Sequence, residues 1–317
     1  METRKSVNIP SARREFASAR PIVEFAPAES KGVLKVEEVR AIVERSRDRL
    51  LNIPEPKGRD LAQLFDSFAP IWQIDVTGGY DRVGYPTWHD DGAAIVVDQA
   101  KPTVFTRVSH AIVGKQVLLQ LNFSVWFQER PRDGPLDTLG GNLDGLIWRV
   151  TLAPDGRPLI YDSVHTCGCY HLLFPLGPML SKPHHTRTHA LKELPAILNT
   201  APMPGPRQRV LLRLATATHY LVAASVVEPE VVQHTRRVYR FAEDRSLRSL
   251  RLPSGGRRSL FRDDGIIAGT ERLERFVLWP MGVNSPGALR QWGHHATAFL
   301  DRRHFDDPNL FERIFGK

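Results

Sequence analysis

The 317-residue chain lacks any apolar run long enough to cross a bilayer, which takes about 18 or more residues. Its first 20 residues are polar and basic and have no apolar h-region, so no secretory signal is indicated there. Cysteine is nearly absent, because only Cys167 and Cys169 occur, and a pair this close cannot staple distant parts of a fold. These absences predict that the chain has no transmembrane segment. The scarcity of cysteine indicates a reducing compartment, and we expect a cytoplasmic location.

Motifs that identify common enzyme classes are also missing. The chain has no glycine-rich phosphate loop with lysine, no dinucleotide fingerprint, no Gly-x-Ser-x-Gly elbow and no Cys-x-x-Cys-His heme attachment site. Lysine is scarce, since the 43 basic residues comprise 34 Arg and 9 Lys. The net charge of +8 suits phosphate, but a nucleic-acid footprint needs basic residues gathered on one face, so charge alone does not favour nucleic acid as the partner.

The composition is that of a folded protein. An apolar share of 42%, with 9% aromatic and 25% charged residues, suffices to offset the loss of chain entropy. Residues 1–32 mix three prolines with Ser, Ala and Arg without periodicity, so we expect an irregular N-terminal tail there. Residues 33–317 contain no repeat and no evident linker. We therefore expect a single large α+β domain over 33–317.

Helical spacing occurs toward both ends of the chain and strand patterns occur between them. Apolar residues recur at helical spacing over 33–51, with further helices expected at 60–68 and 288–300. Strands rich in Val, Ile, Phe and Leu are expected at 93–97, 103–113, 117–127, 209–214, 220–227 and 238–241. A hairpin is expected over 146–163, around Pro154, Asp155 and Gly156. The predicted class is α+β, with a mostly antiparallel β-sheet core and N-terminal and C-terminal helices.

The most chemically loaded stretch lies between residues 165 and 189. His165, Cys167, Cys169 and His171 fall on alternate positions, and an extended chain sends alternate side chains to one face. A straight strand separates the outer two by about 20 Å at about 3.3 Å per residue, so one ion cannot be shared by all four unless the chain bends at Gly168.

A second pair of histidines follows Pro183, which suits the first turn of a helix. His185 and His189 would lie one helical turn apart, the spacing by which a helix presents two nitrogens to one metal. Glu193 continues the same face and is a candidate third ligand or base. Thiolate and imidazole ligands favour a transition metal, Zn or Fe, over Mg or Ca.

Other carboxylates and histidines have weaker signals. His89 and Asp91 form a His-x-Asp pair, which supplies two of the three ligands in the two-histidine, one-carboxylate site of non-heme iron enzymes. A loop explains the pair equally well, because Asp and Gly are common in loops. Asp137, Asp144 and Asp162 lie near predicted strand ends and are candidate acids or bases. Nothing in the sequence identifies their partners.

These observations predict a metal-dependent enzyme, a hydrolase or an oxidoreductase acting on a small molecule. His165, Cys167, Cys169, His171, His185 and His189 are the candidate ligands of the metal, and Glu193 and Asp91 are the candidate catalytic residues. The first alternative is a non-catalytic β-rich binding protein, because buried cysteines and histidines often have structural roles. The second alternative is a phosphate-binding or nucleic-acid-binding surface on the Arg-rich segment 236–262.

Overall fold

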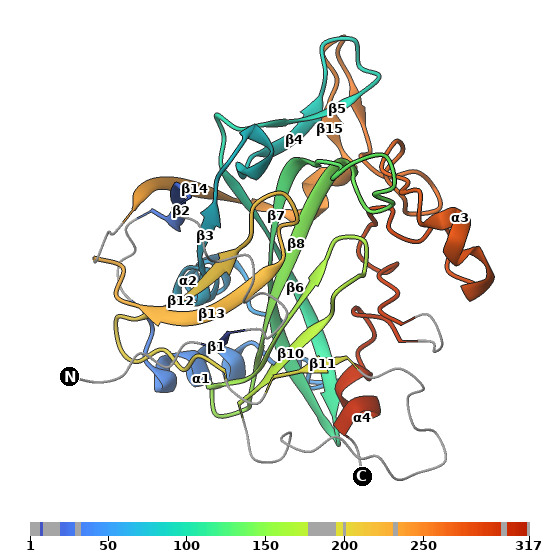
Figure 1. Cartoon of the computed structure of the whole chain (residues 1–317). Helices are drawn as coiled ribbons and strands as arrows, with labels where there is room; N and C mark the ends of the chain where they lie inside the picture. Colours follow the sequence, from blue (N-terminus) through green and yellow to red (C-terminus); the bar gives the residue numbers. More distant parts are fainter. Residues whose placement is uncertain are drawn as a thin grey trace.

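The computed structural model describes residues 7–8, 20–28, 33–176, 195–198, 201–230, 234–298 and 303–315. A large curled mixed sheet dominates these residues (Figure 1). Its 12 described strands follow the spatial order β1 (Val7–Asn8), β13 (Leu221–Val227), β12 (Arg209–Leu214), β3 (Ile71–Asp75), β2 (Ile22–Pro27), β14 (Thr235–Glu243), β6 (Thr103–Val113), β7 (Gln116–Arg130), β8 (Gly141–Leu152), β9 (Pro158–His165), β10 (Leu172–Pro175) and β11 (Ala196–Ile197).

Two small hairpin sheets and a few short helices complete the described residues. The small sheets are β4 (Tyr85–Trp88) with β5 (Ile95–Asp98), and β15 (Leu250–Arg251) with β16 (Arg257–Arg258). The α-helices are α1 (Val36–Arg45), α2 (Gly58–Phe68), α3 (Arg275–Leu278) and α4 (Leu310–Phe315), and the 3-10 helices are η2 (Gly79–Asp81), η4 (Asp244–Arg248) and η5 (Trp279–Met281). No helix among the described residues is long and apolar enough to span a membrane.

The predicted fold class is wrong. The sheet is mixed, because β14 pairs in parallel with both β2 and β6, and β12 pairs in parallel with β3. The helix expected at 288–300 is absent from its described part, 288–298, where Gly293 has a φ of +98° and Arg290 bridges to Ile266. Residues 22–27, within the segment expected to be irregular, form β2. The division at residue 32 stays a prediction.

Local sequence patterns were more reliable than the class. The helix α1 forms within the stretch that its apolar spacing indicated, α2 covers the predicted stretch and begins two residues earlier, and β6 spans the predicted residues. The β8–β9 hairpin is confirmed, with Gly156 at a φ of +88° donating its N–H to the Ala153 carbonyl in the turn. Each of these elements is specified by its own residues, whereas parallel pairing joins segments far apart in the chain.

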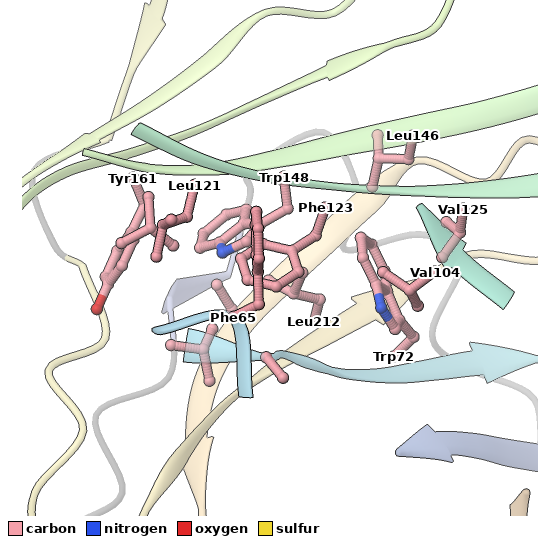
Figure 2. Close-up of a cluster of buried hydrophobic side chains, with 14 of the residues drawn as sticks. Phe65, Trp72, Val104, Leu121, Phe123, Val125, Leu146, Trp148, Tyr161 and Leu212 are labelled. Carbon is pink, nitrogen blue, oxygen red and sulfur yellow. The ribbon is translucent and has the colours of Figure 1, made fainter. Parts of the chain in front are cut away.

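The curl of the sheet encloses the main hydrophobic core (Figure 2). Alternate residues of β8, Leu146 and Trp148 among them, point into it and meet side chains from β3, β12 and α2. The intervening residues of β8 are buried as well, because the C-terminal segment 303–315 covers the other face. Both faces of β8 are therefore removed from water beyond its first two residues.

A buried ion pair fastens the C-terminal segment to that outer face. Arg149 of β8 and Asp162 of β9 are cross-strand partners, joined by hydrogen bonds of 2.9 Å and 2.5 Å. Arg149 also donates to the Phe305 carbonyl at 2.6 Å and lies over the Phe305 ring. His171 contacts the same Asp162 carboxylate at 3.1 Å. Burial alone raises the pKa of Asp162, but Arg149 and His171 outweigh it and hold the pKa below its usual range.

Removing one partner of this pair should leave an uncompensated buried charge. We expect Arg149→Ala to lower the free energy of unfolding in urea by about 3–5 kcal/mol. The control is Arg45→Ala, which removes the exposed bidentate pair between Arg45 and Asp60 and should lower the free energy of unfolding far less, because water screens that pair. Equal losses for the two variants would contradict this account of how the C-terminal segment is attached.

Candidate functional site

One end of the enclosed core is charged instead of apolar. The carboxyl ends of β3, β7, β9 and β12 and the amino end of β8 meet there, together with η2 and the turn between β12 and β13. Four titratable side chains are buried at this end: Asp81 follows β3, Asp144 lies on β8, His165 ends β9 and His219 precedes β13. We call these four residues the relay.

The relay alternates carboxylates with imidazoles. Asp144 lies at its centre, with Oδ2 at 2.8 Å from Nδ1 of His219 and Oδ1 at 3.4 Å from Nδ1 of His165. Nε2 of His219 lies 3.5 Å from Oδ1 of Asp81. The aromatic ring of Phe127 stacks flat on His219 with 3.8 Å between ring centroids, which fixes the plane of this imidazole.

Asp81 forms the far end of the relay and is held by the backbone. Its carboxylate accepts N–H donors of Thr77 and Ala217, at 2.8 Å and 2.7 Å, and the Thr216 hydroxyl at 2.7 Å. Burial alone raises the pKa of Asp81, but His219 and these donors outweigh it and lower the pKa. Asp81 is therefore an anion in a fixed position, on the side of His219 that faces away from Asp144.

The charges of the relay stabilise one another. Burial alone raises the pKa of Asp144, but its contacts with His165 and His219 hold the pKa well below its usual range. Burial alone lowers the pKa of His219, but its bonds to Asp144 and Asp81 outweigh burial and raise it above 6.5. The relay thus favours an ionised Asp144 beside a protonated His219.

The other end of the relay faces an aromatic and cationic surface. The ring of His165 makes edge contacts with Tyr170 and Tyr220, at centroid distances of 5.3 Å and 5.6 Å. Arg130 donates to the Tyr220 hydroxyl at 3.2 Å. Tyr170 is partly exposed, and burial and its contact with Tyr220 raise its pKa, so this phenol stays neutral and able to donate. Tyr170, Tyr220 and Arg130 form what we call the mouth of the site.

Nitrogen Nε2 of His165 is the free end of the relay. It is buried and has no hydrogen-bond partner among the described residues. A buried polar atom without a partner costs about 1–3 kcal/mol, so such atoms call for an explanation. Asp144 contacts the opposite nitrogen, so Nε2 is the nitrogen of His165 that is left without a partner among the described residues.

Backbone strain concentrates around the relay. Leu143, Tyr170, Ala217 and His219 all have positive φ values, between 51° and 61°, although none is glycine. Each adjoins or belongs to the relay or its mouth. Such conformations cost about 1–3 kcal/mol each and are found preferentially at functional sites.

The structure separates the histidines and cysteines that the sequence placed together. The chain reverses after His165, and Gly168 adopts a φ of +92° in the turn before β10. A Cβ on Gly168 would lie 2.2 Å from the Ala296 carbonyl oxygen, so no larger residue fits. His165 consequently contacts Asp144, whereas His171 contacts Asp162. The chain does bend at Gly168, as a shared metal site would require. The bend nevertheless leaves His165 and His171 with different partners.

The two cysteines occupy this turn as free thiols. Sγ of Cys167 accepts the N–H of Cys169 at 3.3 Å, and both residues are half-buried. Contact with Cys167 and burial raise the pKa of the Cys169 thiol. Within the described ranges, no three His, Cys, Asp or Glu side chains group closely enough to hold a metal ion.

The remaining predicted residues lie elsewhere. Asp91 is exposed in the β4–β5 turn, where its carboxylate accepts the Ala93 N–H and lies 3.4 Å from His89. His185, His189 and Glu193 lie outside the described residues. Sequence reasoning missed Asp81, His219, Tyr220 and Arg130, because they are distant in sequence from His165 and belong to no motif. Asp144 was noted only as a carboxylate near a strand end.

Comparisons with known proteins add little to this geometry. No family model and no curated protein matches the chain. A solved structure entitled "Toxin fold for microbial attack and plant defense" is similar at 14% identity, over 58% of this chain and 77% of that chain, with a TM-score of 0.26. A likeness this weak supports no conclusion about fold or function.

The raised pKa of His219 predicts how stability depends on pH. The folded state binds the proton of His219 more tightly than the unfolded state does, so this stabilisation is complete below pH 6.5 and is lost as pH rises through the folded pKa. We expect the Tm to fall on going from pH 6 to pH 9, and His219→Gln to reduce that fall. His89→Gln, a change in an exposed loop, should keep the wild-type slope; an identical slope in all three proteins would refute the assignment.

Proposed function

We propose that this protein is a hydrolase that uses His165 as its general base. The main support for this proposal is the state of the two ring nitrogens of His165. Nε2 is buried and has no partner among the described residues, while Nδ1 contacts the Asp144 carboxylate. A carboxylate at Nδ1 keeps the proton on that nitrogen and leaves the lone pair on Nε2, which is the form a base requires. His219 holds Asp144 in place, and Asp144 in turn fixes the orientation of the His165 imidazole.

The mouth supplies the other groups that hydrolysis needs. Attack of water on an ester carbonyl places negative charge on the carbonyl oxygen, and a cation or donors beside it stabilise that charge. The Arg130 guanidinium and the phenols of Tyr170 and Tyr220 lie at the mouth and suit this role. Their aromatic faces also suit a substrate with an apolar group.

The proposed reaction has two proton transfers. His165 Nε2 takes a proton from water as the water oxygen bonds to the carbonyl carbon. The bond from that carbon to the leaving oxygen then breaks, and His165 returns the proton to the leaving oxygen. The relay behind His165 stabilises the imidazolium that exists between these two transfers.

Hydrolysis of a panel of chromogenic aryl esters, with short and long acyl chains, tests this proposal. We expect His165→Ala to lower kcat/KM by about 100-fold or more, because general base catalysis contributes about 10²–10⁴-fold. Asp144→Asn should lower it as well, by disturbing the tautomer, whereas His89→Gln should have no effect. Turnover that is absent across the panel, or that survives in His165→Ala, would contradict the proposal.

A metal-dependent enzyme is a second candidate function for this protein. Histidines that bind metals usually donate their other nitrogen to a carboxylate. His165 and His171 each contact a buried aspartate, and their opposite nitrogens, Nε2 and Nδ1, have no partner among the described residues. A complete metal site would need further ligands from outside the described ranges.

Elemental analysis of untagged protein tests the metal candidate separately. A metal-dependent enzyme predicts about one Zn or Fe per chain in the wild type and its loss in His165→Ala, with His89→Gln retaining it. Wild-type protein that is folded, metal-free and active on an ester would contradict the metal candidate and favour His165 as a general base. Metal retained in His165→Ala would exclude His165 as a ligand.

A further inference from the structure

Four large apolar side chains project into solvent from one short segment. Phe276, Val277, Trp279 and Met281, in α3 and η5, are 65%, 69%, 73% and 39% exposed. We call these four residues the apolar ridge. Figure 1 shows α3 at the periphery of the molecule, projecting away from the sheet. A contiguous group of exposed apolar side chains indicates an interaction site, whereas isolated ones need no explanation.

The base of the ridge is well anchored. The N–H of Leu278 donates to the Glu274 carbonyl at 2.8 Å, and the N–H of Glu274 donates to the Thr138 carbonyl at 3.2 Å in the β7–β8 loop. Arg272 is buried and donates to the carbonyls of Asn142 and Leu143 at the start of β8. The exposure of the ridge is therefore a property of a segment tied to the sheet.

The composition of the segment points to the chemistry of its partner. Residues 276–289 contain no charged side chain, although a quarter of the chain is charged. Tryptophan and phenylalanine beside aliphatic residues are typical of the layer where lipid headgroups meet acyl chains. Arg275 borders the ridge, with its guanidinium 4.7 Å from the Phe276 ring centroid, and the chain carries a net charge of +8. Positive charge beside apolar side chains complements an anionic lipid surface.

From these observations we infer that the apolar ridge inserts into the interfacial layer of an anionic lipid membrane. A second copy of this chain fits less well, because a stable protein interface takes about 20–30 residues on each partner, and the ridge belongs to a projecting segment of only seven. Insertion needs only a few side chains to enter the lipid. Membrane contact through the ridge does not depend on the chemistry at His165.

The tryptophans provide a direct readout. Of the six in the chain, Trp72, Trp88, Trp126 and Trp148 are buried, Trp292 is half-buried and Trp279 is exposed. Vesicles of phosphatidylcholine with phosphatidylglycerol should shift the emission of Trp279 to shorter wavelength. Brominated acyl chains should quench that emission.

A matched pair of variants tests the ridge itself. Phe276→Ser with Val277→Ser keeps the Trp279 reporter and should weaken sedimentation with these vesicles at least about tenfold. The control, Leu50→Ser with Leu51→Ser, removes apolar side chains that are 93% and 69% exposed elsewhere and should sediment like the wild type. Circular dichroism checks that both variants are folded.

Three results would overturn the inference. The first is wild-type protein that does not sediment with the anionic vesicles. The second is equal sedimentation of the ridge variant and the wild type, which would indicate attraction of the net charge alone. The third is a concentration-dependent dimer that the ridge substitutions dissociate, which would assign the ridge to contact between copies of this chain.

Discussion

The arrangement of the candidate site depends on one buried carboxylate that two histidines share. Asp144 contacts His165, 21 residues away, and His219, 75 residues away, and it lies at the end of a core that is otherwise apolar. An isolated carboxylate could not remain ionised there, because its desolvation costs several kcal/mol. The two imidazoles, with Asp81 behind His219, make the ionised state stable and give His165 a fixed orientation.

The curled sheet brings these residues together. β14 joins the two parts of the sheet, because its first half pairs with β2 and its second half with β6. The ends of strands distant in sequence consequently meet around Asp144. The same region anchors the apolar ridge, since Arg272 bonds to the carbonyls of Asn142 and Leu143 beside Asp144. The catalytic candidate and the candidate membrane contact therefore share one rigid part of β8.

Sequence patterns predicted the local elements and part of the site. The Pro-Asp-Gly turn between β8 and β9 and the bend at Gly168 depend on the residues within them, so both were foreseeable. The cluster around His165 also drew attention to the turn that borders the candidate site. The contacts of Asp144 with His219 and of His165 with the mouth arise from strand pairing over long sequence separations, which has no local signature. The mixed sheet was missed for the same reason, because parallel neighbours such as β2 and β14 lie some 200 residues apart.

We propose that Asp144 fixes the proton of His165 on Nδ1 and leaves Nε2 as a base. Nitrogen-15 NMR of the histidine rings at a pH where His165 is neutral tests it most directly, with His165→Gln identifying the signals. We predict a protonated Nδ1 and an unprotonated Nε2 in the wild type, and loss of that preference in Asp144→Asn. A wild-type His165 protonated on Nε2 would contradict the account, because the atom assigned as base would already carry a hydrogen.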